Sequence, residues 1–222
     1  MRAFHLLRTE YALQALRTEE VKVSRFDDLN DPFELYGAEL SNHAHRRTFD
    51  KFKRWASERF GLLCFSRRWR NPLLWSHYGD RHRGVALDFE IDDDLVEEVQ
   101  YSPYRLRLDV KKKLAAGGFS EEDACRIATT KSAYWKYEEE VRVFVELSEC
   151  RFQNGLFFEP VSDQIRIIGI VLGPLCDLSK REIESALPRG RQLHLTQSRF
   201  AFRSFSVVRN RAVATSVVYG IA

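Results

Sequence analysis

The stretch Glu140-Val-Arg-Val-Phe-Val-Glu-Leu147 predicts a β-strand, because valines at alternate positions are separated by longer or charged side chains. A second stretch, Ile165-Arg-Ile-Ile-Gly-Ile-Val-Leu172, is almost entirely apolar, which is typical of a strand inside a sheet. Shorter strands are expected over residues 5–7, 21–24, 62–66, 84–90, 191–196 and 200–208. Strands are concentrated toward the two ends of the chain, with helices between them. This order predicts an α+β fold with a mixed or antiparallel sheet.

Capping residues mark the starts of several expected helices, because their side chains accept hydrogen bonds from free backbone N–H groups. The expected caps are Thr9, Asn71 with Pro72 at the first helical position, Ser120 with Asp123, and Ser179 with Glu182. Other helices are expected over 41–60 and 108–116, and the one that begins at Ser120 is expected to run toward Trp135. Within 41–60 an apolar stripe at helical spacing predicts a core-facing side. Its members are Phe49, Phe52, Trp55, Ala56 and Phe60.

Composition indicates one folded domain over residues 1–222. Of the 222 residues 44% are apolar and 13% aromatic, which excludes a disordered chain. No run approaches the ~18 apolar residues of a transmembrane helix, so no membrane association is expected. The four cysteines are far apart and form no CxxC pair, which argues against a zinc site or a disulfide framework. We therefore expect a cytoplasmic protein without a bound metal.

Charge is distributed in blocks, although the net charge is only +3. Residues 46–83 contain eleven Lys and Arg against three acids, and 88–98 contain seven acids and no base. Residues 189–211 contain six Arg and no acid. Basic blocks of this kind suit a surface that meets phosphate groups, and an ordinary solvated face is the alternative.

Three regions hold polar residues that could form a site, although no common nucleotide-binding or hydrolase motif is present. The first is His5 on the opening strand, where a buried structural His is the alternative. The second is Asn71-Pro-Leu-Leu-Trp-Ser-His-Tyr-Gly79, whose aromatic and hydrogen-bonding side chains suit a planar ligand, or simple packing. The third is Tyr137-Glu-Glu-Glu-Val-Arg142, where Glu138 and Glu140 would share one face of a strand, or merely form its charged end.

These stretches resemble known families. A first strand with His5 and a late strand beginning at Glu140 are similar to the ADP-ribosyltransferase superfamily. Leu63-Cys-Phe-Ser66 with the following aromatic helix resembles the DarT toxins, which ADP-ribosylate DNA. Leu29-Asn-Asp-Pro-Phe-Glu34, Trp75-Ser-His-Tyr78 and Trp135-Lys-Tyr-Glu-Glu-Glu-Val-Arg142 resemble the signature of a widespread bacterial family of undefined function.

The resemblance implies an ADP-ribosyltransferase-like split sheet and an NAD-dependent enzyme. Glu140 would be the catalytic carboxylate, Glu138 would orient the nucleophile, and Tyr78 would stack on nicotinamide. The cofactor contacts that it implies are His5, Arg25, Asn30, Asp31, Ser66, Trp75 and His77, with Arg46, Arg47 and Arg67 as alternatives to Arg25 at the diphosphate. The enzyme would be a toxin or antiphage effector that modifies DNA or RNA, with an antitoxin as a further partner. Arg67, Arg68 and Arg70 are the candidates for holding the nucleic-acid backbone.

Two other functions remain open at this point. A nucleic-acid-binding module without catalysis would use the basic blocks alone. A nuclease would use His5, His77 and a glutamate as acid and base groups. Convergence of Glu140, His5 and Tyr78 on one cleft would favour an enzyme, whereas dispersal beside a continuous basic stripe would favour the binding module.

Overall fold

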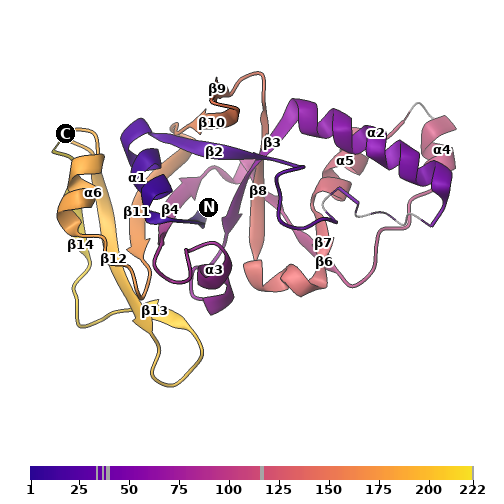
Figure 1. Cartoon of the computed structure of the whole chain (residues 1–222). Helices are drawn as coiled ribbons and strands as arrows, with labels where there is room; N and C mark the ends of the chain where they lie inside the picture. The colour runs from indigo at the N-terminus through magenta and orange to yellow at the C-terminus, as the bar shows by residue number, and fades with distance from the viewer. Residues whose placement is uncertain (34, 37, 39–40, 116–117, 222) are drawn as a thin grey trace.

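The fold is α+β, with a mixed but largely antiparallel sheet and helices packed around it (Figure 1). The computed structural model describes residues 1–33, 35–36, 38, 41–115 and 118–221. Of the sequence features above, Glu34 and residue 116, the expected end of the helix over 108–116, lie outside the described residues. No helix in the described ranges combines the length and apolar character needed to cross a membrane.

One part of the sheet, here called the first half-sheet, contains the apolar strand expected over residues 165–172. Its strands are β1 (Arg2–Leu7), β4 (Val85–Ile91), β11 (Ile165–Leu172), β12 (Gln192–Phe200), β13 (Val207–Arg209) and β14 (Ser216–Tyr219). β11 lies between β4, to which it is antiparallel, and β12, to which it is parallel. The interior position of β11 confirms the expectation from its composition. β1 pairs with β4 along its whole length, from Arg2 opposite Glu90 to Leu7 opposite Val85.

The other part, the second half-sheet, contains the alternating strand that begins at Glu140. Its strands are β2 (Glu20–Arg25), β3 (Phe60–Ser66), β5 (Glu97–Glu98), β8 (Glu140–Glu146), β9 (Arg151–Gln153) and β10 (Leu156–Pro160). β3 and β8 pair along their whole length, from Phe60 opposite Glu146 to Ser66 opposite Glu140. Two short parallel strands, β6 (Gln100–Ser102) and β7 (Thr130–Ser132), lie apart from the main sheet.

The two half-sheets meet at β1 and β3 and separate from there. Among the described residues, β1 and β3 are joined by one residue pair, Phe4 opposite Ser66. Each strand is otherwise paired with a partner on its own side, β1 with β4 and β3 with β8. β1 and β3 are therefore neighbours in one sheet that are joined by a single residue pair, and this sparsely paired junction is called the split below.

Helices cover both half-sheets and enclose separate apolar clusters. They are α1 (Thr9–Thr18), α2 (His43–Arg59), α3 (Pro72–His77), α4 (Val110–Ala115), α5 (Glu121–Ala128) and α6 (Lys180–Ala186), with short 3₁₀ helices η1 (Asp93–Leu95) and η2 (Ala133–Glu138). α1 and α6 pack on an apolar cluster that takes strand residues from both half-sheets, and α2 and α5 pack on a second cluster beside β3 (Figure 1). On the first half-sheet, Leu74 and Trp75 of α3 pack against a face that includes Phe4 and Val171.

The capping predictions are confirmed at three of the four helices. Asn71, Ser120 and Ser179 each accept a backbone N–H bond, and the last two form complete capping boxes. Thr9 is not a cap: the preceding Arg8 occupies that position and makes no side-chain cap bond, because the helix begins one residue earlier than expected.

Two helix predictions need correction. Trp55 is 46% exposed although Phe49 and Ala56 of the same stripe are buried, because the contact face of α2 is narrower than the apolar stripe. The helix that begins at Ser120 ends at Ala128, where the chain turns into β7 and then η2 before reaching β8.

Candidate functional site

A cavity of about 230 Å³ opens where β1 and β3 separate. β1, β3, α3, β7, the loop after β2 and the segment leading into β8 all contribute to its walls. Its lining residues are Phe4, His5, Leu6, Ser24, Asp28, Leu29, Asn30, Cys64, Phe65, Ser66, Leu74, Tyr78, Lys131, Glu138 and Glu140. The split in the sheet thus brings together polar side chains that are far apart in the sequence.

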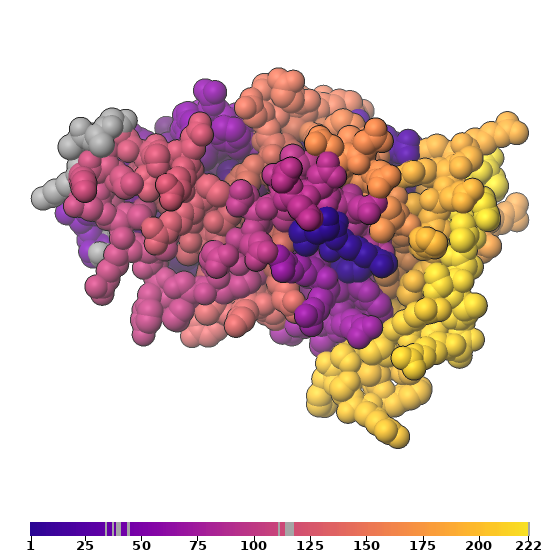
Figure 2. Space-filling view, turned by 180° about the vertical axis from the view of Figure 1, so that it is seen from behind, coloured from indigo at the N-terminus to yellow at the C-terminus, as the bar shows by residue number. Residues whose placement is uncertain are grey.

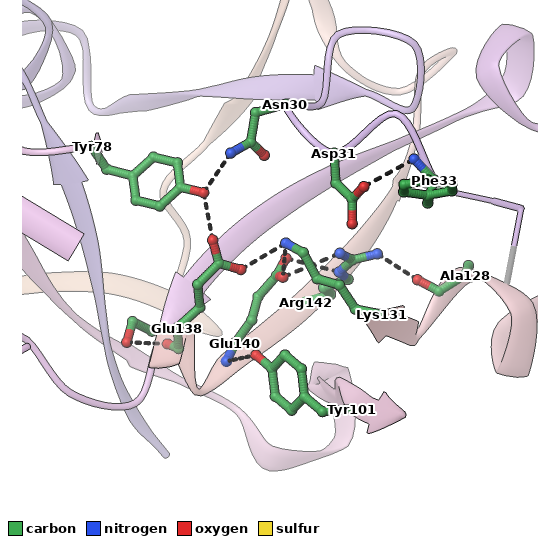
Figure 3. Close-up of polar contacts among 11 residues, drawn as sticks. Asn30, Asp31, Phe33, Tyr78, Tyr101, Ala128, Lys131, Glu138, Glu140 and Arg142 are labelled. Atoms are coloured by element: carbon green, nitrogen blue, oxygen red, sulfur yellow. Dashed lines mark hydrogen bonds and ion pairs between the residues drawn. The ribbon is translucent and has the colours of Figure 1, made fainter. Parts of the chain in front are cut away.

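Glu138 and Glu140 are both buried and share one cation. The Nζ atom of Lys131 donates to Oε2 of Glu138 over 2.6 Å and to Oε2 of Glu140 over 2.8 Å. Lys131 is itself buried, on β7. Figure 3 shows the two carboxylates converging on this ammonium group from different parts of the backbone.

The two carboxylates do not reach the cavity by the route that strand alternation predicts. Glu140 is the first residue of β8, but Glu138 is the last residue of η2. Glu139 between them has a left-handed backbone, with φ of 43°. This turn, rather than a shared strand face, directs both side chains toward Lys131.

Arg142 forms the second cationic contact of Glu140. Its Nε donates to Oε1 over 2.8 Å and its Nη2 to Oε2 over 3.1 Å. Its Nη1 donates to the carbonyl oxygen of Ala128 over 2.5 Å, and the side chain is fully buried. An Arg held in this way keeps a neighbouring carboxylate ionised and fixes its orientation.

Tyr78 links Glu138 to the loop after β2. Its hydroxyl donates to Oε1 of Glu138 over 2.5 Å and accepts from Nδ2 of Asn30 over 2.7 Å (Figure 3). Burial and the nearby Glu138 charge raise the pKa of Tyr78, so the phenol remains a hydrogen-bond donor. Asn30 and Tyr78 therefore form one side of the polar wall.

The two glutamates differ in acidity. Burial alone would raise the pKa of Glu140, but the charges of Arg142 and Lys131 outweigh it and lower that pKa to about 2. Burial raises the pKa of Glu138, and Lys131 offsets this only in part. The site thus contains a permanently ionised carboxylate beside one that is a stronger base.

His5 faces the cavity from β1 in one defined tautomer. Its Nδ1 lies 2.7 Å from the carbonyl oxygen of Cys64 on β3. A carbonyl oxygen only accepts, so Nδ1 carries the proton and Nε2 is left as an acceptor. Burial lowers the pKa of His5, which favours this neutral ring.

Of the remaining residues expected at a cofactor, Ser66 lies at the cavity, whereas Trp75 and His77 do not. Ser66 donates to the carbonyl oxygen of Glu138 over 2.5 Å and so holds the segment that leads into β8. Trp75 is fully buried in the apolar cluster of α3, because its position on that helix points into the sheet. His77 is exposed and stacks on Tyr137, so His5 and His77 do not meet at one site.

Arg25 and Asp31 also lie outside the cavity. Arg25 forms an ion pair with Asp27 at 3.0 Å and lines a separate surface hollow. Asp31 is buried, and its Oδ1 accepts from the backbone N–H of Phe33 over 2.9 Å. It lines a neighbouring hollow, which touches the first cavity through Lys131. The hydrogen bond to Phe33 is typical of an Asp in a turn, so a structural role in this loop accounts for Asp31.

The three arginines expected at a nucleic-acid backbone lie together between β3 and α3. Arg67 is paired with Glu98, and Arg68 with Glu139 at 3.2 Å. Arg70 lies over the ring of Trp69 at 5.9 Å. All three side chains are at the surface, although two are partly neutralised by acids.

The sequence analysis gave no role in the site to Lys131, Arg142 or Tyr101, although Arg142 ends one of the three candidate stretches. The Tyr101 hydroxyl accepts from the backbone N–H of Glu140 over 2.8 Å. Arg142 gave one usable signal, because a charge flanked by valines inside a strand buried on both faces requires a partner. Lys131 gave none, because its role depends on the path of the chain between α5 and β8. Within the described residues, no group of three or more His, Cys, Asp or Glu is arranged to hold a metal ion.

One family model matches a segment of the chain that contains part of this site. Residues 74–143 match a family described as a protein of unknown function (DUF2971). The matched segment runs from α3 into β8 and contains Tyr78, Lys131, Glu138 and Glu140. No curated protein and no solved structure shows significant similarity to the chain. The similarity thus covers about a third of the chain and coincides with most of the polar wall of the cavity.

Proposed function

We propose that the protein is an NAD-dependent ADP-ribosyltransferase with an ADP-ribosyltransferase-like split sheet. The observation that supports this proposal is the convergence of His5, Tyr78, Glu138 and Glu140 on one cavity. The cavity lies at the split between β1 and β3, and a binding module that used only a basic surface would not require this arrangement.

The cavity suits part of a dinucleotide better than a whole one. Its volume of about 230 Å³ is below the ~300–1,000 Å³ of pockets that enclose drug-sized ligands. We propose that it takes the nicotinamide ring, against Tyr78, and the attached ribose, near His5. Nε2 of His5 would accept a hydrogen bond from a ribose hydroxyl. The ADP part would extend out of the cavity.

The two carboxylates would divide the chemistry. Bound NAD supplies ADP-ribose when the bond between C1′ of the ribose and the nicotinamide nitrogen breaks, and the bonding electrons leave with nicotinamide. Glu140, ionised at every physiological pH, would stabilise the positive charge that develops on the ribose. Glu138 would accept the proton that the nucleophile loses as it bonds to C1′. Lys131 and Arg142 would be positioning residues.

The nucleophile is proposed to belong to DNA or RNA, in keeping with the basic residues beside the cavity. Arg67, Arg68 and Arg70 precede α3, which carries Tyr78 at its end. A phosphate held there would leave a neighbouring base or hydroxyl close to the reactive ribose. The setting would be that of a toxin or antiphage effector, with an antitoxin as its partner.

The direct test is incubation with NAD labelled in the adenylate part, with separate pools of DNA, RNA and protein. Label in nucleic acid, absent with Glu138→Gln, is the expected result. Release of nicotinamide without label in any pool would reduce the function to NAD hydrolysis. No loss of NAD in any pool would refute the proposed function.

A further inference from the structure

The connection between β12 and β13, residues 201–206, projects from the body of the molecule (Figures 1 and 2). It is called the β12–β13 loop below. Phe202 is 87% exposed and Phe205 is fully exposed. Neither ring belongs to the apolar clusters that the described residues form. Single exposed apolar residues are common, but two bare rings on one projecting loop indicate a contact surface.

The loop is also cationic. The guanidinium of Arg199, near the end of β12, lies 4.1 Å from the centroid of the Phe202 ring, and the exposed Arg203 follows Phe202 in the loop. Residues 189–211 contain no acid that could neutralise these charges. Among the described residues, neither Arg199 nor Arg203 forms an ion pair with an acid elsewhere. Aromatic rings interleaved with unneutralised guanidinium groups fit a partner that carries planar groups and negative charge.

The base of the loop is anchored next to the candidate site. The backbone N–H of Val207 donates to the carbonyl oxygen of Arg70 over 2.9 Å. Val207 is fully buried in the cluster that holds Trp75, and Tyr78 packs against that cluster. A partner bound on the loop would therefore lie beside α3 and the arginines that precede it.

We infer that the β12–β13 loop binds single-stranded nucleic acid. Bases stack on Phe202 and Phe205, and phosphates contact Arg199 and Arg203. Only unpaired bases offer their faces to such rings, so single strands are preferred over a duplex. The role of the loop in presenting a target to the cavity rests on the proposed function, whereas the binding itself does not.

The binding test uses fluorescently labelled oligonucleotides and measures anisotropy with the full chain. Single-stranded DNA and RNA should bind more tightly than a duplex of the same length. Phe202→Ala and Phe205→Ala should each weaken single-strand binding about tenfold or more. Phe152→Ala is the matched control, because Phe152 is also an exposed ring but lies on β9, at the opposite edge of the sheet from β13. Equal affinities of all these variants would overturn the inference.

The charge test compares two arginines in the same acid-free stretch. Arg203→Gln should reduce the slope of log affinity against log salt by about 0.7 for a single strand. Arg189→Gln removes the same charge before the other end of β12 and should leave the slope unchanged. Equal slope changes would mean that only overall charge matters, which would overturn the inference. So would loop-dependent binding to phosphatidylserine vesicles without binding to oligonucleotides.

NAD cleavage measured without nucleic acid separates this inference from the proposed function. Phe202→Ala and Phe205→Ala should retain it, because both residues lie outside the cavity lining. If the wild-type chain binds single strands through the loop but does not cleave NAD, the proposed function fails and the loop inference stands. If the wild-type chain cleaves NAD but binds single strands independently of the loop, the loop inference fails and the proposed function stands.

Discussion

His5 and Cys64 are joined across the split in the sheet by a hydrogen bond of 2.7 Å, from Nδ1 of the imidazole to the carbonyl oxygen. The bond connects β1 to β3 at the point where their backbone pairing is reduced to Phe4 and Ser66. It therefore does two things at once: it supports the junction of the half-sheets, and it presents Nε2 to the cavity.

The first prediction concerns pH and His5. Burial lowers the pKa of His5 in the folded chain, so the unfolded chain binds the proton more readily. The free energy of unfolding should therefore decrease as the pH falls below about 6.5. His5→Asn retains a donor for Cys64 and does not titrate, so its unfolding should show a smaller decrease. Urea unfolding of both proteins between pH ~5 and ~8 measures the difference.

His82 titrates in the same direction and remains in both proteins, so its contribution cancels in that comparison. If the free energy of unfolding depended on pH in the same way for the wild type and His5→Asn, the conclusion that His5 is a buried neutral imidazole would be contradicted.

The second prediction concerns the charge balance around Glu140. Glu140→Gln leaves the fully buried Arg142 without its carboxylate, which should destabilise the fold by about 3–5 kcal/mol. Adding Arg142→Met should recover part of that loss, because the unpaired charge is then removed. NAD cleavage should fall at least ~100-fold in both variants. Thermal unfolding and nicotinamide release provide the two measurements.

Recovery of activity together with stability in the double variant would show that Glu140 acts only through the fold. The double variant separates two roles of Glu140, because its ion pairs with Lys131 and Arg142 stabilise the fold while its carboxylate is proposed to act in the reaction.

The third prediction concerns the hydroxyl of Tyr78. Tyr78→Phe keeps the ring but removes the bond to Oε1 of Glu138, which stabilises the ionised carboxylate. The pKa of Glu138 should rise further, so the acid limb of the pH–rate profile should move to higher pH. Asn30→Ala, which removes the other partner of the hydroxyl, is the control for loss of the network alone. An acid limb that stays in place in Tyr78→Phe would exclude Glu138 as the base.

The fourth prediction separates the core from the site at α3. Trp75 is fully buried, so Trp75→Ala should cost about 3–5 kcal/mol of stability. The milder Trp75→Phe should lower the melting temperature while leaving KM for NAD unchanged, because Trp75 does not line the cavity. An increase in KM with Trp75→Phe would restore the cofactor contact that the resemblance implied for Trp75.

Local signals in the sequence predicted much of the fold. The caps at Asn71, Ser120 and Ser179 are formed as expected, because capping depends on atoms within three residues of one another. The apolar stretch of β11 lies inside the sheet, because few other environments accommodate such a sequence.

The site was predictable only where its residues carry a local signal. Glu138 and Glu140 are conspicuous in the sequence because they belong to a run of three acids. Lys131, which binds both carboxylates, lies on a strand that no periodicity predicted. Trp75 illustrates the opposite error, since an aromatic beside polar residues suits both a ligand and a core. Only the direction in which α3 faces the sheet decides between the two.

The pairing of Phe4 with Ser66 also has a mechanical consequence. Parting the half-sheets at this seam disrupts fewer backbone bonds than parting strands paired along their whole length, such as β1 from β4 or β3 from β8. A ligand in the cavity would contact both β1 and β3 and so stabilise their association. A bound ligand should therefore slow amide hydrogen exchange in β1 and β3 along the seam. The exchange rate at this seam would then report whether the cavity is occupied.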